Sequence, residues 1–511
     1  MTAQASEIAE LLITCETNGP APEYLRSDPD NPKPPVPIAS HGDEVFVVSD
    51  LHLADGQGED GRYDGSENFF CDASFRRFLD HAHANLKSTN AILIINGDFI
   101  DFLRITYIPR EDSQFIEWQQ ILEQIGIEKP IAELTSSISK KELTYGLKTQ
   151  DYKSVLRLHI AVRGHTEFFE ALAQWLGIGH RIIIVKGNHD LEWYWQGVRN
   201  YLRLALARRL AEQVGTADIK DVLENRVLPN IRFIDDSLVI DEDIYIEHGH
   251  RYDKYAHVVG PSTLNDDQEL NIPFGSFFNR YLLNDIELNY PFLDNVRPST
   301  NILPLLIRER LPLALKVLFK HVPFVFRIIP KGYYRYMFSQ VFWLFLLVIV
   351  PVVFIIWLIL GMFDHGLDLL TTPSQPQSFL HKTVSTVLTS IASLVISYAL
   401  ARVVGRLNLV EPGDLTKYAR EKLAEKSSYR LATFGHTHNP DQFKENGRWF
   451  FNTGTWIPIF EMSSAELRVD KTYSFLHLEP DAAGKLAGIL KRWEDGAGRA
   501  EPAIVLKRAG E

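Results

Sequence analysis

The sequence predicts an α/β fold that carries an inserted pair of hydrophobic helices, and three observations support this prediction. Short β-branched runs that end in turn residues recur along the first 250 positions, helical stretches separate these runs, and two long charge-free stretches follow. Buried strands read as continuous apolar runs, whereas charge-free stretches of about 20 residues are typical of membrane spans. We therefore expect a mixed or parallel sheet that is interrupted by a transmembrane hairpin.

The first strands are predicted from three apolar runs at 45–48, 91–95 and 181–185, which end in Ser-Asp, Asn-Gly-Asp and Lys-Gly-Asn. Runs of four or five β-branched and apolar residues closed by such turn signals indicate buried strands. Helical stretches, for example 75–86 and 167–176, lie between them. The alternation of strand and helix predicts β-α-β units.

The hydrophobic hairpin is predicted from 337–363, which has no charged residue over 27 positions, and from 383–401, which has none over 19. A helix of 20 residues is about 30 Å long, the thickness of the hydrocarbon core of a bilayer. Residues 297–335 carry eight basic residues against one acid, which is typical of a segment on an anionic membrane surface. Since positive charge flanks both spans, we expect the flanks in the cytoplasm. The alternatives are a buried core hairpin and a solvated basic helix face.

Overall composition excludes two classes of protein. The chain has 511 residues, a formal charge of −12 and two cysteines, Cys15 and Cys71. Broad nucleic-acid surfaces gain affinity from excess Lys and Arg, so we expect no nucleic-acid partner, and two distant cysteines exclude a disulfide scaffold. No feature indicates a protein partner.

The chain is predicted to have six consecutive parts. They are a Pro-rich N-terminal lead-in (1–43), a first core part (44–254) with a helical insertion (104–160), a basic amphipathic segment (255–336), a hairpin (337–404, spans 340–361 and 383–403), a second core part (405–480) and a C-terminal tail (481–511).

Five short motifs carry metal-binding residue types, and each follows a predicted strand, at 45–48, 91–95, 181–185, 244–246 and 431–434. They are Asp50-Leu51-His52, Gly97-Asp98-Phe99-Ile100-Asp101, Gly187-Asn188-His189-Asp190, His248-Gly249-His250 and Gly435-His436-Thr437-His438. In Asp-x-His and His-x-His the two ligands lie on one side of an extended turn, because alternate side chains point the same way. A mixed Asp, Asn and His set suits Mn²⁺, Zn²⁺ or Fe. One such motif arises easily by chance, whereas five in this order predict a metal site. The similar run at 163–167 (RGHTE) is interpreted instead as the start of a helix.

This motif order resembles that of the calcineurin-like metallophosphoesterase superfamily, over about 44–250 and 430–460. The resemblance implies a two-layer β-sandwich flanked by helices, with two divalent metal ions at the strand ends. It implies that Asp50, His52 and His438 hold one metal and that Asn188, His248 and His436 hold the other. Asp98 would bridge the two, and Mn²⁺ is the expected metal, with Zn²⁺ or Fe as alternatives.

The resemblance also implies roles for four neighbouring residues. His189 would act near the leaving oxygen as a proton or hydrogen-bond donor, with Asp190 orienting it. Asp101 and His250 would support the ligands or face the substrate. The motifs look most like those of the UDP-2,3-diacylglucosamine hydrolase branch, in Ser-Asp-Leu-His-Leu, His-Gly-x-x-Tyr-Asp and Gly-His-Thr-His-Asn-Pro. That branch usually has Arg at the position of His189 and Asp at that of His250, so its metal site is carried over and its substrate is not.

Together these features predict a membrane-anchored, multi-pass, dinuclear metal-dependent phosphoesterase with a cytoplasmic catalytic domain. It would hydrolyse a phosphate ester or pyrophosphate through a hydroxide activated by two metals. A phosphate-containing small molecule or a lipid-linked phosphate is the expected substrate. The first alternative keeps this chemistry for a soluble nucleotide or phosphoprotein, with the hairpin as an anchor. The second alternative is a non-catalytic membrane scaffold.

Overall fold

The computed structural model describes residues 3–18, 33–58, 60–63, 66–264, 268–283, 296–297, 312, 415–461, 466–467, 472–503 and 505. The chain divides into two units, Met1–Arg327 with Asp414–Glu511, and Ile328–Gly413. The second unit lies outside the described residues.

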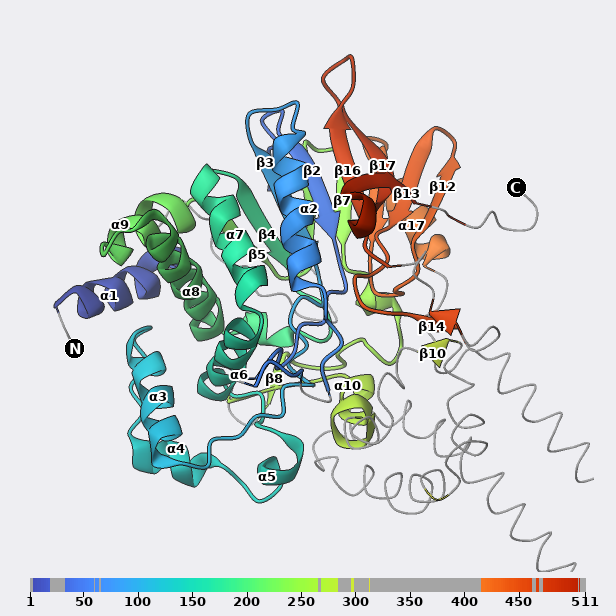
Figure 1. The fold of residues 1–511 in the computed structure, drawn as a ribbon. Coiled ribbons are helices and arrows are strands. Elements are labelled where there is room, and N and C mark those ends of the chain that lie inside the picture. Colours follow the sequence, from blue (N-terminus) through green and yellow to red (C-terminus); the bar gives the residue numbers. More distant parts are fainter. Residues whose placement is uncertain are drawn as a thin grey trace, which may run out of the picture. The chain divides into compact units, whose positions relative to one another are not determined.

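The larger sheet has seven strands in the order β18-β17-β16-β2-β3-β4-β5 (Figure 1). These are β2 (Glu44–Val48), β3 (Ala91–Asn96), β4 (Arg181–Val185), β5 (Ile231–Ile234), β16 (Ser474–Pro480), β17 (Leu486–Glu494) and β18 (Arg499–Pro502). β2 to β5 are parallel, whereas β16, β17 and β18 are antiparallel additions beside β2. The three strands predicted from apolar runs are confirmed as β2, β3 and β4. Their side chains are almost all buried, as expected of strands covered on both faces.

The second sheet has six strands in the order β1-β6-β7-β11-β13-β12. These are β1 (Val36–Ile38), β6 (Ser237–Ile240), β7 (Ile244–Glu247), β11 (Leu431–Phe434), β12 (Asp441–Glu445) and β13 (Arg448–Asn452). One apolar cluster joins the facing sides of the two sheets, with Val47 and Ile94 from the larger sheet and Ile246 and Leu431 from the smaller. Two short ladders are also described, β8 (Thr263–Leu264) with β9 (Glu269–Leu270), and β10 (Val296–Arg297) with β14 (Phe460–Glu461) and β15 (Glu466–Leu467).

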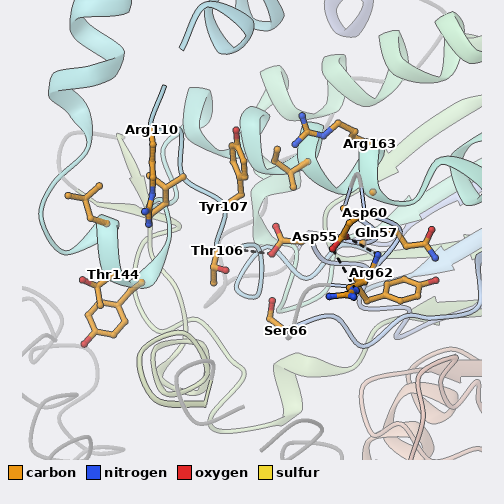
Figure 2. Close-up of a pocket in the computed structure, with 18 of the residues that line it drawn as sticks. Asp55, Gln57, Asp60, Arg62, Ser66, Thr106, Tyr107, Arg110, Thr144 and Arg163 are labelled. Atoms are coloured by element: carbon orange, nitrogen blue, oxygen red, sulfur yellow. Dashed lines mark hydrogen bonds and ion pairs between the residues drawn. The ribbon is translucent and has the colours of Figure 1, made fainter. Parts of the chain in front are cut away.

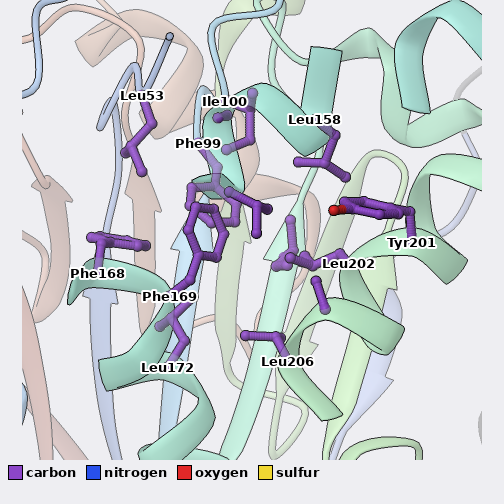
Figure 3. Close-up of a cluster of buried hydrophobic side chains, with 14 of the residues drawn as sticks. Leu53, Phe99, Ile100, Leu158, Phe168, Phe169, Leu172, Tyr201, Leu202 and Leu206 are labelled. Atoms are coloured by element: carbon purple, nitrogen blue, oxygen red, sulfur yellow. The ribbon is translucent and has the colours of Figure 1, made fainter. Parts of the chain in front are cut away.

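Helices cover the outer face of the larger sheet (Figure 1). The longer ones there are α2 (Asp72–Ala84), α7 (Thr166–Ile178) and α8 (Gln196–Val214), followed by α9 (Ile219–Val222). Phe99, Phe168 and Phe169 pack with Leu202 and Leu206 in the core between these helices and the sheet (Figure 3). Two further helices are α10 (Phe274–Phe278) and α17 (Thr416–Glu425). α7 begins at Thr166 with Glu167 in its first turn, which confirms the interpretation of 163–167 as a helix start.

The segment predicted as a helical insertion contains α3 (Asp112–Glu123), α4 (Ile131–Ser137), α5 (Glu142–Tyr145) and α6 (Asp151–Gly164). α6 is held against the body by a buried ion pair of 2.8 Å between Arg157 and Glu192. The segment predicted as a lead-in contains α1 (Ala3–Asn18), whose Glu16 pairs with Arg199 and Arg203 of α8.

The prediction of an inserted transmembrane hairpin, and with it a two-span membrane localisation with a cytoplasmic catalytic domain, is corrected. Within the described ranges, no helix combines the length and the apolar character that a membrane crossing needs. The longest of these helices, α8 with 19 residues, carries Arg199, Arg203, Arg208 and Arg209, whereas a span requires about 20 predominantly apolar residues. The predicted spans 340–361 and 383–403 lie outside the described residues, as does most of the basic segment. The structure supports a mixed α/β fold of two sheets and helices.

Candidate metal centre

The five predicted motifs begin within three residues of the carboxyl ends of β2, β3, β4, β7 and β11. β2, β3 and β4 run parallel in the larger sheet, and β7 and β11 run parallel in the smaller one. Carboxyl ends of parallel strands meet at one edge of a sheet, where ligands bind in open α/β sheets. The loops that follow these strands therefore converge from both sheets.

Five of the predicted ligands lie in the left-handed backbone region, with φ between 51° and 68°. These are Asp50, His52, Asp98, His436 and His438. Such a conformation costs a residue other than glycine roughly 1–2 kcal/mol, and strain of this kind clusters at functional sites. A neighbouring glycine makes room for one of them, because a Cβ at Gly187 would lie 2.2 Å from Oδ1 of Asp98.

The first group of donors consists of Asp50, His52 and His438, as predicted. Nε2 of His438 lies 3.3 Å from Oδ1 of Asp50 and 3.1 Å from Nε2 of His52. Nδ1 of His52 bonds to Oδ2 of Asp101 at 3.1 Å. This bond makes Nδ1 the protonated nitrogen of neutral His52, so that Nε2 presents a lone pair to the other two donors.

The second group consists of Asp98, His248 and His436. Nε2 of His248 lies 3.2 Å from Oδ2 of Asp98, and the same oxygen lies 3.7 Å from Nε2 of His52. Asp98 therefore stands between the two groups, in the bridging place that the resemblance implies. Burial by itself would raise the pKa of Asp98, but His248 and His189 hold it well below its usual range.

Several side-chain groups could hold a metal ion, and buried polar atoms test whether these two groups fit one. Oδ1 of Asp50, Oδ1 of Asn188 and Nε2 of His248 are buried and make no hydrogen bond. Buried polar atoms are normally satisfied, and these three belong to predicted ligands. Nδ1 of His248 bonds to the backbone oxygen of Asn96 at 2.8 Å, so Nε2 is the nitrogen that faces Asp98 and would bind a metal ion. Imidazole, carboxylate and amide donors together fit a divalent transition metal.

His189 lies beside this centre, with ring centroids 4.7 Å from His52. Its Nδ1 bonds to Oδ2 of Asp101 at 3.0 Å. Burial lowers the pKa of His189, but Asp101 and Asp98 outweigh that effect and raise it to about 9. Asp190, which we expected to orient His189, instead accepts backbone N–H groups of Phe99 and Gly187. Asp101 is therefore the carboxylate that orients His189.

His250 packs beside a ligand without belonging to either group. Its ring centroid lies 5.5 Å from that of His248. Burial, His248 and His436 together hold the pKa of His250 well below its usual range, so its imidazole is neutral near pH 7.

Two residues that were not among the predicted site residues support the ligands. Arg104 is fully buried, and its Nε lies 3.3 Å from Oδ2 of Asp101. Asp253 lies 3.1 Å from Nε2 of His436, which leaves Nδ1 of that histidine for a metal. Asp253 closes the His-Gly-x-x-Tyr-Asp motif, and Arg104 follows Asp101 by three positions, so each stood next to a recognised motif.

Besides a group of His52, Asp101 and His189 at the same centre, a fourth donor group, which the sequence did not predict, joins Glu44, His477 and Glu479. Glu44 begins β2, so this group is at the opposite end of that strand from Asp50. Nζ of Lys491 lies 2.8 Å from Nδ1 of His477, and Nε2 of His477 lies 2.7 Å from Glu44. An ammonium group already supplies positive charge there, so this group is interpreted as an ion-pair cluster.

Comparison with known proteins adds no further assignment, since no protein-family model matches the chain and no curated protein matches it.

Proposed function

We propose that this chain is a metal-dependent phosphoesterase that hydrolyses a phosphate ester or pyrophosphate in a phosphate-containing small molecule. The observation that carries the proposal is the position of Asp98, whose Oδ2 lies between His52 and His248 of two adjacent donor groups. Paired sites that share a carboxylate suit chemistry at phosphorus, where both attacking and leaving oxygens need stabilisation. The resemblance of the five motifs to metallophosphoesterases supports the same conclusion.

Each residue of the centre has a role in this proposal. Asp50, His52 and His438 would hold one ion, and Asn188, His248 and His436 the other, with Asp98 between them. Two bound cations, for which Mn²⁺ is favoured and Zn²⁺ or Fe are alternatives, would activate water and neutralise phosphate charge.

His189 is the proposed proton donor to the leaving oxygen. Asp101 accepts a hydrogen bond from Nδ1–H of His189. The Nε2 atom of His189 can therefore donate a proton or a hydrogen bond to the leaving oxygen. Arg104 contacts the Asp101 carboxylate and helps to hold it in place.

The test uses the purified full chain, loaded with Mn²⁺, Zn²⁺ or Mg²⁺, on p-nitrophenyl phosphate and bis-p-nitrophenyl phosphate. We expect turnover with a transition metal, and Asp98→Asn should lower it by more than the roughly 10–100-fold that loss of a supporting partner costs. Asp80→Asn, an exposed aspartate on α2, is the matched control and should keep full turnover. Undiminished turnover by the Asp98 variant, or none by the wild type with any metal, would overturn the proposal.

A further inference from the structure

A large cavity has a wall that begins at Asp55, three positions after His52, and none of the metal-binding residues lines it. It has a volume of about 890 Å³, within the range of small-molecule sites. Its walls come from the loop after His52, from 106–110 and from α5 and the end of α6 (Figure 2). We propose that this arginine-lined cavity binds a second anionic group of the substrate, so that the substrate is a phosphate ester with another phosphate or carboxylate. That the bound anion is part of the substrate rests on the proposed function, whereas anion binding by the cavity does not.

The charge of the cavity is the first support. Four arginines line it, Arg62, Arg110, Arg163 and Arg280, against two acids, Asp55 and Asp60, which gives +2 in a chain with a net charge of −12. A positive cavity in an acidic protein concentrates anions locally.

The arginines are also available to a ligand. Arg62 and Asp60 lie 3.8 Å apart and are largely in solvent, whereas Arg163 and Glu117, also 3.8 Å apart, each have somewhat less than half of the side chain exposed. Exposed pairs of this kind contribute about 0–1 kcal/mol, so an incoming anion displaces them at little cost. Arg110 is exposed and makes no ion pair with any residue in the described part of the chain. Arg280 is buried and donates to the carbonyl oxygens of Gly146 and Leu147.

The chemistry of these side chains defines the ligand. A guanidinium group presents a planar fork of donors that matches phosphate or carboxylate oxygens. Tyr107 and Tyr63 also line the cavity, and the guanidinium of Arg163 lies 5.7 Å from the Tyr107 ring centroid. An organic anion with apolar parts therefore fits better than a free metal or a neutral sugar.

One buried arginine connects the cavity to the metal centre. Arg104 donates to the backbone oxygen of Ser66, a cavity residue, at 3.0 Å, and Ser66 Oγ donates in return to the Arg104 oxygen at 3.1 Å. The same guanidinium contacts Asp101, which bonds to both His52 and His189. The two loops that start with metal ligands thus continue directly into the cavity walls. Arg104 is therefore in contact both with a cavity residue and with the carboxylate that orients His52 and His189.

Binding without metal tests the cavity independently of catalysis. The full chain is stripped of metal with a chelator, and binding of inorganic diphosphate is measured by calorimetry at low and physiological salt. We expect wild-type binding that weakens with salt, and at least tenfold weaker binding by Arg110→Gln with Arg163→Gln. Arg499→Gln, an exposed arginine paired with Glu501 on β18, is the matched control and should bind like wild type. Absence of wild-type binding, or equal binding by the double variant, would overturn the inference even if the enzyme is active.

Substrate preference then tests the link to the reaction. Two substrates are compared, hexyl phosphate and hexane-1,6-diyl bisphosphate, which differ by one anionic group. We expect wild type to prefer the bisphosphate in kcat/KM, and the Arg110 and Arg163 double variant to lose at least tenfold of that preference. The Arg499 variant should retain the preference. A preference that is the same in all three proteins would contradict the role of the cavity, and absence of turnover on both substrates by wild type would contradict the proposed function alone.

Discussion

Nε2 of His52 lies 3.1 Å from Nε2 of His438, although 386 positions separate the two residues in the chain. Asp101 binds the Nδ1 proton of His52, so the nitrogen that faces His438 carries a lone pair. A cation or a proton between these two nitrogen atoms would make their short contact favourable. Four predictions follow the same physical reasoning, two for the centre and two for the fold around it.

Metal should stabilise the folded chain. A ligand that binds only the native state adds about 2.7 kcal/mol when its free concentration is 100 times its Kd. We expect Mn²⁺ to raise the Tm of wild type in scanning calorimetry, with the chelated protein as reference, and Asp50→Asn to lose most of that gain. His477→Gln, in the cluster that contains Lys491, is the control and should keep it. An equal gain by the Asp50 variant would exclude Asp50 as a ligand.

Asp101→Asn should weaken the metal centre without removing a ligand. The carboxylate orients both His52 and His189, and loss of such a partner typically costs about 10–100-fold in metal affinity or activity. Competition against a fluorescent chelator measures the affinity, with Asp80→Asn as the exposed control. Wild-type affinity in the Asp101 variant would show that the two histidines are oriented by other contacts.

His165 should make stability depend on pH. It is fully buried between Glu67 (3.0 Å) and Asp72 (2.9 Å), and although burial lowers its pKa, the two carboxylates raise it from 6.5 to about 10. The ion pair therefore contributes fully below pH 6.5 and is lost as the pH rises through about 10. In urea unfolding we expect His165→Gln to be less stable than wild type by about 3–5 kcal/mol at pH 6.5, with a smaller difference at pH 10. A difference that does not change between these pH values would contradict the charged state of His165.

Gly164→Ala should destabilise the junction between α6 and the loop that follows His52. A Cβ at Gly164 would lie 1.9 Å from the backbone oxygen of Asp55, and backbone cannot move away as a flexible side chain can. Overpacking of this kind costs about 1–3 kcal/mol, which urea unfolding should detect. The control is Gly496→Ala, because a Cβ there meets no atom within 4 Å. Equal stability of both variants would show that this junction moves apart freely.

The sequence alone predicted the strands whose signal is local. The apolar runs became β2, β3 and β4 because buried strands require such runs, and the motifs after them came together because parallel strands bring their carboxyl ends to one edge. The role of Asp101 was not predictable in the same way. His189 pairs with Asp101 and not with Asp190 because the turn after β4 directs the Asp190 carboxylate to backbone N–H groups.

Contacts between segments that are far apart in the chain could not be predicted from local sequence patterns. The segment predicted as a tail supplies β17 and β18, and the one predicted as a lead-in supplies α1 and β1. Glu16 of α1 finds Arg199 only through the folded arrangement of α8. The predicted membrane hairpin is not supported, since no helix in the described part of the chain is long and apolar enough to cross a membrane.

The pairing of β16 with β2 has a consequence for the order in which the protein is made. β2 is synthesised early, yet its neighbour on one side, β16, begins only at Ser474. At roughly 5–20 residues per second, translation separates the two strands by tens of seconds. During that interval one edge of β2 has no partner strand from its own chain, and unpaired edges promote association with other chains. The incomplete chain is therefore more prone than the finished chain to associate through this edge of β2.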